Sequence, residues 1–234
     1  MKKIVFLLII VSLFSCTGKK TENLVSQIYE TEGSGVENDK RIKELTLEIK
    51  KLNKDLEATL NKYEKVGNFH RALGIKMMHY KMYLKAYEHF SKAIEFFPNS
   101  EMLHYYKGVA AGQYALSQDS EVIKREYLEK AKYSQEYAIQ LNPRFTKGLY
   151  ALSILYVYEF DRIDDAKPLL DTLLQISTRE FDAMLLRALL YERDGELNAA
   201  LDMYDSVLSM SKNDIHIIKA ETNREKILSR ISDE

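Results

Sequence analysis

Apolar residues along most of the chain recur at steps of three and four positions, which is the spacing of one face of an α-helix. The longest stretch of this kind, residues 40–66, contains no glycine or proline. Its apolar positions are Ile42, Leu45, Ile49, Leu52, Leu56, Leu60 and Tyr63. The pattern predicts one long amphipathic lead-in helix that ends at Gly67. Because about three heptads are the lower limit for a coiled coil, we favour packing against the following helices over self-association.

Beyond Gly67 the helical spacing is combined with a fixed order of small and large residues. In residues 70–100 this order is Leu73, Gly74, Tyr83, Ala86, Phe90, Ala93 and Pro98. Ala86, Phe90 and Ala93 are spaced to share one face of a helix. The small side chains allow two helices to approach closely, and the ring fills the gap between neighbouring hairpins.

The same order returns three times along the chain. The later units contain Gly108, Ala131, Ala138 and Pro143; then Leu152, Ser153, Tyr156, Ala166 and Leu170; then Ala188, Tyr191, Gly195, Ala200 and Tyr204. The second unit has an insertion that contains residues 117–123 and should lengthen both of its helices. Gln135 replaces its aromatic residue, so we expect poorer packing or the use of Tyr133 and Tyr137 instead. In the third unit, Pro168 is tolerable if Asp164 caps the helix.

This order resembles the tetratricopeptide repeat (TPR), a helix–turn–helix unit of 34 residues. The resemblance implies an all-α solenoid of about four hairpins over residues 67–213, after the lead-in helix at 40–66. Residues 214–234 carry Ile215, Ile218, Ile227, Leu228 and Ile231 and are expected to form the capping helix that ends such a solenoid. The repeat itself says little about function, because the scaffold serves many unrelated partners.

The first sixteen residues follow a different pattern. Lys2 and Lys3 precede an apolar run from Ile4 to Phe14, which is too short to cross a hydrocarbon core of about 30 Å and predicts an export signal. The run ends in Leu13-Phe14-Ser15-Cys16, which resembles the lipobox of bacterial lipoproteins, with a bulkier Phe14 than the common pattern. The resemblance implies removal of residues 1–15 and acyl lipid on Cys16. The alternative is an ordinary secretory peptide with an incidental cysteine.

Residues 16–39 are polar and contain three glycines, which predicts a flexible tether between the lipid and the folded body. An apolar island at residues 24–29 is interpreted as incidental rather than as a docking segment. Two or three acyl chains would hold the protein on a membrane of the cell envelope, facing the periplasm or the surface. The outer membrane is favoured because Thr17, and not aspartate, follows Cys16.

Composition narrows the classes of protein that fit. The chain of 234 residues has 34 basic and 35 acidic side chains, so it lacks the positive charge of a nucleic-acid binder. Only 9 glycines and 3 prolines provide little turn chemistry for a β-sandwich or barrel. The single cysteine excludes a disulfide framework and a thiolate zinc site. We therefore expect an all-helical binding protein without nucleic acid as a partner.

No motif in the chain points to catalysis. None of the five histidines, His70, His79, His89, His104 and His216, stands in a compact metal-binding pattern. The sequence also has no glycine-rich phosphate loop and no nucleophile elbow. We expect no enzyme activity, no metal and no cofactor other than the covalent lipid on Cys16.

The first helices of TPR hairpins line a concave groove, and the resemblance transfers this role to eleven positions. They are Arg71, Ile75, Met78, Tyr105, Val109, Tyr150, Ile154, Val157, Leu185, Leu189 and Glu192. This surface is apolar and aromatic and lacks the cluster of basic residues that holds a peptide carboxylate in some family members. It suits an amphipathic helix or an extended peptide. The alternative is that the lead-in or capping helix fills the groove.

These observations favour a membrane-anchored adaptor of the bacterial cell envelope that binds a partner protein or peptide in its groove. One alternative is an accessory lipoprotein in the assembly of outer-membrane proteins or secretins. Another is an accessory of a periplasmic solute-transport system that binds a hydrophobic ligand. The sequence leaves the three open.

Overall fold

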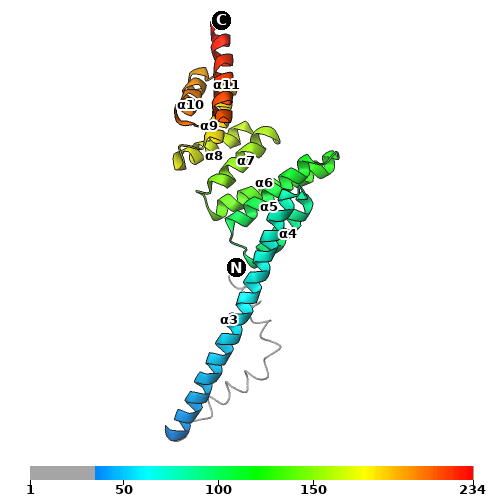
Figure 1. The fold of residues 1–234 in the computed structure, drawn as a ribbon, viewed down its shortest axis with the longest axis vertical. Coiled ribbons are helices and arrows are strands. Elements are labelled where there is room, and N and C mark those ends of the chain that lie inside the picture. The colour runs from blue at the N-terminus through cyan, green and yellow to red at the C-terminus, as the bar shows by residue number, and fades with distance from the viewer. Residues whose placement is uncertain (1–34, 234) are drawn as a thin grey trace. The chain divides into compact units, whose positions relative to one another are not determined.

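The structure, a computed structural model, describes residues 35–233. The predicted export signal, Cys16 and most of the predicted tether lie outside these residues. Within residues 35–233 every regular element is an α-helix, which confirms the all-α prediction for this range (Figure 1). The helices are α3 (Gly35–His79), α4 (Tyr83–Phe96), α5 (Glu101–Leu116), α6 (Glu121–Leu141), α7 (Thr146–Tyr158), α8 (Ile163–Ile176), α9 (Phe181–Asp194), α10 (Leu197–Met210) and α11 (Asp214–Asp233).

The described residues divide into two compact units, residues 35–61 and residues 62–233. The second unit contains the four predicted hairpins. Hairpin 1 pairs the end of α3 with α4, hairpin 2 pairs α5 with α6, hairpin 3 pairs α7 with α8, and hairpin 4 pairs α9 with α10. Helix α11 follows hairpin 4 and packs against α10, where a capping helix was expected.

Helix α3 differs from the prediction at both ends. It begins at Gly35, inside the predicted tether, and it continues through Gly67 to His79. Gly67 is not a terminator but a close contact, because a Cβ there would lie 2.6 Å from Phe96 Cβ and 2.6 Å from the Phe97 ring. The helix ends instead where Lys81 adopts φ 56°, and the bonds that close this turn run back to the carbonyl oxygens of α3.

The apolar stripe of the first unit is exposed. The side chains of Ile42, Ile49, Leu52, Leu56 and Leu60 are between 52% and 61% exposed. We expected the following helices to cover this stripe. Among residues 35–61, α3 is the sole helix, so no other element of this unit covers the stripe.

The alternation of small and large residues builds the hairpins as predicted. The four recurring alanines, Ala86, Ala131, Ala166 and Ala200, are fully buried. The large residues that follow them by four positions are buried too, and they are Phe90, Gln135, Leu170 and Tyr204. In hairpin 1, a Cβ on Gly74 would lie 2.6 Å from the Phe90 ring. A glycine opposite a ring therefore sets how closely the two helices approach.

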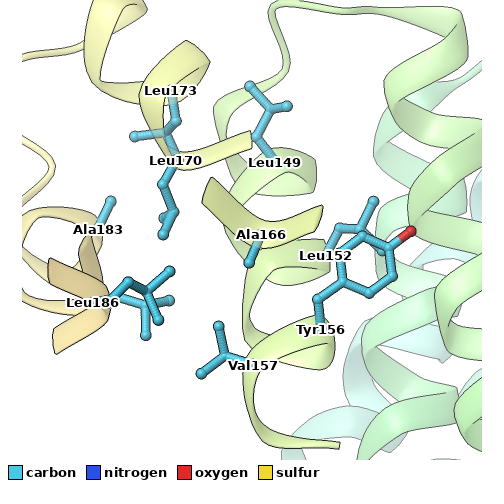
Figure 2. Packing of buried hydrophobic residues seen from close by; sticks show 10 residues of the cluster. Leu149, Leu152, Tyr156, Val157, Ala166, Leu170, Leu173, Ala183 and Leu186 are labelled. Carbon is cyan, nitrogen blue, oxygen red and sulfur yellow. The ribbon is translucent and has the colours of Figure 1, made fainter. Parts of the chain in front are cut away.

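Neighbouring hairpins share hydrophobic clusters. In Figure 2 the side chains of α7, α8 and α9 converge on one such cluster. Leu149 and Leu152 of α7 lie in it with Leu170 of α8 and Leu186 of α9. Because one cluster joins two hairpins, each repeat completes the core of the next.

Hairpin 2 is longer than the others. Helices α5 and α6, green in Figure 1, run side by side over 16 and 21 residues, whereas α7 to α10 have 13 or 14. This confirms that the insertion lengthens both helices. Gln135 itself occupies the buried central position, while Tyr133 is exposed, so Tyr133 does not replace it.

The start of α8 corrects a further prediction. Arg162, and not Asp164, is the residue at the N-cap of α8. Asp164 lies in the first turn, where its carboxylate accepts a hydrogen bond from Lys167 Nζ at 2.9 Å. Pro168 stands inside the helix. Its missing N–H would have bonded the Asp164 carbonyl, and both residues are exposed, so water can solvate that oxygen.

Candidate functional site

A cavity of about 410 Å³ opens between the first helices of hairpins 2, 3 and 4. Its apolar lining includes Tyr105, Val109, Leu116, Tyr150, Ile154 and Leu155. Four of these, Tyr105, Val109, Tyr150 and Ile154, are predicted groove residues. The volume falls within the usual range of ligand pockets in proteins, about 300 to 1,000 Å³.

Gly112 lines the cavity without supplying a side chain to it. Gly112 is buried and lines the cavity, and a Cβ placed there would meet only Ala131 Cβ, at 3.8 Å. The corresponding positions of the other three hairpins carry Met78, Val157 and Glu192. At this position hairpin 2 therefore leaves open the space that a side chain fills elsewhere.

Gln135 lines the same cavity and is only half satisfied. Its side chain is 1% exposed, and its Nε2 donates a hydrogen bond to the Tyr105 carbonyl oxygen at 3.1 Å. Its Oε1 is buried and has no hydrogen-bond partner within the described part of the chain. This oxygen is therefore an acceptor without a donor. Such an atom is unusual, because buried polar atoms in native proteins are nearly always hydrogen-bonded.

Ionisable groups give the cavity a negative balance. Its lining includes three carboxylates, Glu159, Glu180 and Asp182, against one ammonium group, Lys147. Lys124 Nζ approaches Glu159 at 4.0 Å, and His216 Nε2 approaches Asp182 at 3.5 Å.

The two tyrosines of the cavity stay protonated near neutral pH. Burial, and then the negative charge of Asp182, raise the pKa of Tyr150 to about 12. Burial also raises the pKa of Tyr105. Both hydroxyl groups are therefore neutral and able to donate hydrogen bonds at physiological pH.

Sequence comparison identifies the relatives of the chain. It is 30% identical over 206 residues to the TPR repeat-containing protein of Borreliella burgdorferi, and the alignment covers 87% of this chain and 90% of the relative. The chain belongs to the TPR repeat-containing proteins. No protein-family model matches it.

Solved structures support the TPR fold. The thermophilic TPR protein TTC0263 of Thermus thermophilus matches 79% of this chain and 96% of its own, at 18% identity and a TM-score of 0.57. MamA (41-end) of Desulfovibrio magneticus RS-1 matches 72% of this chain and 86% of its own, at 14% identity and a TM-score of 0.58. A human IFIT1 dimer with PPP-AAAA matches 78% of this chain and 44% of its own, at 18% identity and a TM-score of 0.62. These likenesses establish the fold alone.

The TPR groove continues into a second cavity of about 370 Å³ at hairpin 1. Tyr105 and Val109 line both cavities, and Ile75 and Met78 line only the second. With Tyr150 and Ile154 of the first cavity, the structure thus brings six predicted groove residues together in two adjoining hollows. A TPR scaffold with such a surface is suited to protein–protein interaction.

The remaining predicted groove residues lie elsewhere in the TPR unit. Arg71 is exposed on α3 and lines neither cavity. Val157 and Leu185, which are 3% and 9% exposed, belong to hydrophobic clusters. Leu189 packs against the cluster of α7 to α9, and Glu192 accepts a hydrogen bond from the Tyr204 hydroxyl. In hairpins 3 and 4, core packing therefore uses repeat positions whose counterparts in hairpin 2 line the cavity.

Sequence reasoning missed the residues that shape the TPR cavity. Gly112 was not predicted because no binding motif includes a position that lacks a side chain. Gln135 was recognised as the exception to the aromatic position, but as a packing defect and not as part of a cavity. Asp182 and Glu180 begin or precede a helix, and such acids are common there for electrostatic reasons alone.

The histidines of the described chain include one pair that the sequence did not reveal. Nδ1 of His70 lies 3.1 Å from Nδ1 of His89, across hairpin 1. Among residues 35–233 no three His, Cys, Asp or Glu side chains gather in a way that would hold a metal ion. None of the described helices has the length and hydrophobicity of a membrane span.

Proposed function

We propose that the protein is a lipid-anchored TPR scaffold of the bacterial cell envelope, and that it binds a partner polypeptide over the cavity between α5 and α7. The observation that carries this proposal is the cavity itself, whose lining combines four predicted groove residues with an unfilled position at Gly112. Side chains that fill such pockets contribute most of the binding free energy of an interface.

The shape and chemistry of the groove support a polypeptide as the ligand. Two adjoining hollows share Tyr105 and Val109, so side chains from successive positions of one bound segment can enter both. Tyrosine offers apolar area and a hydrogen-bonding hydroxyl on one side chain, which suits the recognition of peptides. Family membership supports protein binding in general.

The lipid anchor in this proposal is supported by the sequence. Lys2 and Lys3, the apolar run from Ile4 to Phe14 and the single cysteine at position 16 have the order of a lipoprotein signal. Acyl chains on Cys16 would keep the scaffold on a membrane, because each buried methylene adds about 0.8 kcal/mol.

Crosslinking in intact cells tests the groove. A photoreactive amino acid at Val109 should capture a partner, whereas the same group at the exposed Val122 of α6 should not. The double variant Tyr105→Ala/Tyr150→Ala should abolish the Val109 product. Its matched control is Tyr80→Ala/Tyr133→Ala, which removes two exposed tyrosines that line neither cavity. Equal capture by both double variants would contradict the groove.

Replacement of Cys16 tests the anchor separately. The wild-type protein should incorporate labelled palmitate and sediment with membranes, and Cys16→Ser should do neither. A Cys16→Ser protein that keeps both the label and the membrane association would contradict the lipid anchor, without affecting the groove.

The cavity also favours a second candidate, an accessory of a periplasmic solute-transport system that binds a hydrophobic ligand. Its volume and largely apolar lining suit a small molecule. Native mass spectrometry of the purified protein should then show a bound molecule that Gly112→Val displaces. A ligand-free spectrum together with a Val109 crosslink would favour the polypeptide.

A further inference from the structure

We infer that the cavity between α5 and α7 receives a basic side chain, arginine or lysine, of the bound polypeptide, with Gln135 Oε1 as its buried acceptor. This inference rests on the proposed function and specifies the chemistry of the partner at the same site.

The first argument is the acceptor without a donor. The bond from Gln135 Nε2 to the Tyr105 carbonyl fixes which end of the amide is nitrogen, because only an N–H can donate to that oxygen. The opposite end is therefore the oxygen, and it has no partner in the described chain. A ligand that satisfies it has to bring a hydrogen-bond donor, and the buried oxygen becomes accessible to that donor when the side-chain amide of Gln135 moves.

The second argument is that packing alone does not require glutamine here. Phe90, Leu170 and Tyr204 hold the same buried position in the other three hairpins. An apolar or aromatic residue thus fills it without leaving a polar atom unsatisfied. A buried acceptor next to an open cavity is consistent with a role in binding rather than in folding.

The third argument is the charge of the lining. Glu159, Glu180 and Asp182 outnumber Lys147, and they favour a cation over an anion in this partly enclosed space. Lys124 lies 4.0 Å from Glu159 and offsets part of one charge. His216 adds a positive charge beside Asp182 only when it is protonated.

The fourth argument is the combination of an apolar wall and a polar end. Lysine and arginine have long methylene stems with donor-bearing charged heads, so the stem can contact Val109 and Ile154 while the head reaches polar groups. Arginine also contacts aromatic rings favourably, and two tyrosines line the cavity. A carboxylate would meet three like charges and an acceptor that cannot bond to it.

Blocked amino acids test the inference on the full-length protein purified in detergent. The probes are the N-acetyl N-methylamides of arginine, lysine, norleucine and glutamate, which present one side chain each. Binding is measured from the shift of the Gln135 side-chain NH₂ resonance in ¹⁵N NMR spectra. The arginine or lysine probe should bind at least about tenfold more tightly than norleucine, and glutamate should bind most weakly.

Two variants locate the effect. Gln135→Leu should remove the preference for the basic probe over norleucine, measured from backbone resonances of α5, whereas Gln140→Leu on the exposed side of α6 should keep it. Gly112→Val should weaken every probe by filling the cavity. Circular dichroism should show the same helix content in all variants.

The outcomes separate this inference from the proposed function. If no basic probe shifts the Gln135 resonance, or if norleucine binds as tightly as arginine, the inference is overturned, while the Val109 crosslink still tests the groove. If Gln135→Leu keeps the preference, Gln135 is not the acceptor and the inference is overturned. If the basic probes bind with the expected preference but no polypeptide crosslinks at Val109, the source of the basic group is a free amine and not a partner protein, which overturns the inference as stated.

Discussion

Hairpins 2 and 4 share one helix arrangement but fill their centres in opposite ways. In hairpin 4, Tyr204 is fully buried, and its hydroxyl donates to Glu192. In hairpin 2, Gln135 is equally buried, but one of its two polar atoms has no partner. The position therefore tolerates very different side chains as long as the residue is buried. The hairpin fold requires a buried residue at this position, and the presence of a cavity depends on which residue it is.

A second repeat position, on the first helix of each hairpin, increases the contrast. Glu192 in hairpin 4 supplies the acceptor for Tyr204, whereas Gly112 in hairpin 2 supplies no side chain. Hairpin 4 is thus closed by its own residues, and hairpin 2 keeps both a hollow and an unused acceptor. A single repeat of a solenoid can thus hold a cavity while another repeat is closed by its own side chains.

The largest effect should come from removing the aromatic residue of hairpin 4. Tyr204→Ala should lower the free energy of unfolding by about 3–5 kcal/mol, because it empties a fully buried site. Urea titration followed by circular dichroism measures the change. Gln135→Ala should cost clearly less, since it also removes an unsatisfied atom. Equal losses would show that the two centres contribute alike.

A smaller loss should follow when the close approach in hairpin 2 is disturbed. A Cβ at Gly108 would lie 2.5 Å from Gln135 Nε2 and 3.1 Å from the Ala131 carbonyl oxygen. Gly108→Ala should therefore destabilise the protein by about 1–3 kcal/mol. Gly112→Ala, one turn along the same helix, meets no such contact and should stabilise it by up to about 1 kcal/mol. Thermal melts of the two variants should shift in opposite directions.

Making hairpin 2 resemble hairpin 3 should cost little or nothing. Gln135→Leu copies Leu170, loses one hydrogen bond and removes one buried unsatisfied oxygen. The free energy of unfolding should be unchanged or higher by about 1 kcal/mol. The exposed Gln140→Leu serves as the control for surface hydrophobicity. A loss above about 2 kcal/mol would mean that Gln135 is needed for folding.

The smallest effect concerns alkaline pH. Between the ordinary tyrosine pKa near 10 and the pKa of about 12 for native Tyr150, the unfolded chain ionises this hydroxyl while the folded protein keeps the proton. Its contribution to stability is therefore complete below pH 10 and is lost as pH rises through 12. Tyr150→Phe should show a shallower fall in melting temperature across this range. Parallel curves for the two proteins would contradict the raised pKa.

The hairpins were predictable because their signal is repeated and local. Ala86, Ala131, Ala166 and Ala200 mark the second helix of each hairpin, and all four are buried as expected. The same reasoning failed at Gly67, where glycine has two physical uses, to end a helix or to admit a neighbour. Only the approach of Phe96 and Phe97 distinguishes them, and that contact is tertiary.

The candidate site was predictable only in part. The register of the repeat placed Tyr105, Val109, Tyr150 and Ile154 on one surface, and these residues line the cavity. The same register treats every hairpin alike, so it also selected Val157. Whether such a position faces a hollow or a core depends on the packing of adjacent hairpins. One periodic pattern does not contain that information.

The continuity of α3 through Gly67 changes how its first half can be stable. Starting a new helix fixes the backbone of several residues for a single hydrogen bond. Lengthening an existing helix adds one hydrogen bond for each residue fixed. The turns that pack against α4 provide the nucleus, and the turns from Gly35 to Asn61 need only propagation. Fraying should therefore proceed from one end, so amide hydrogens should exchange fastest near Gly35 and progressively more slowly towards Tyr63.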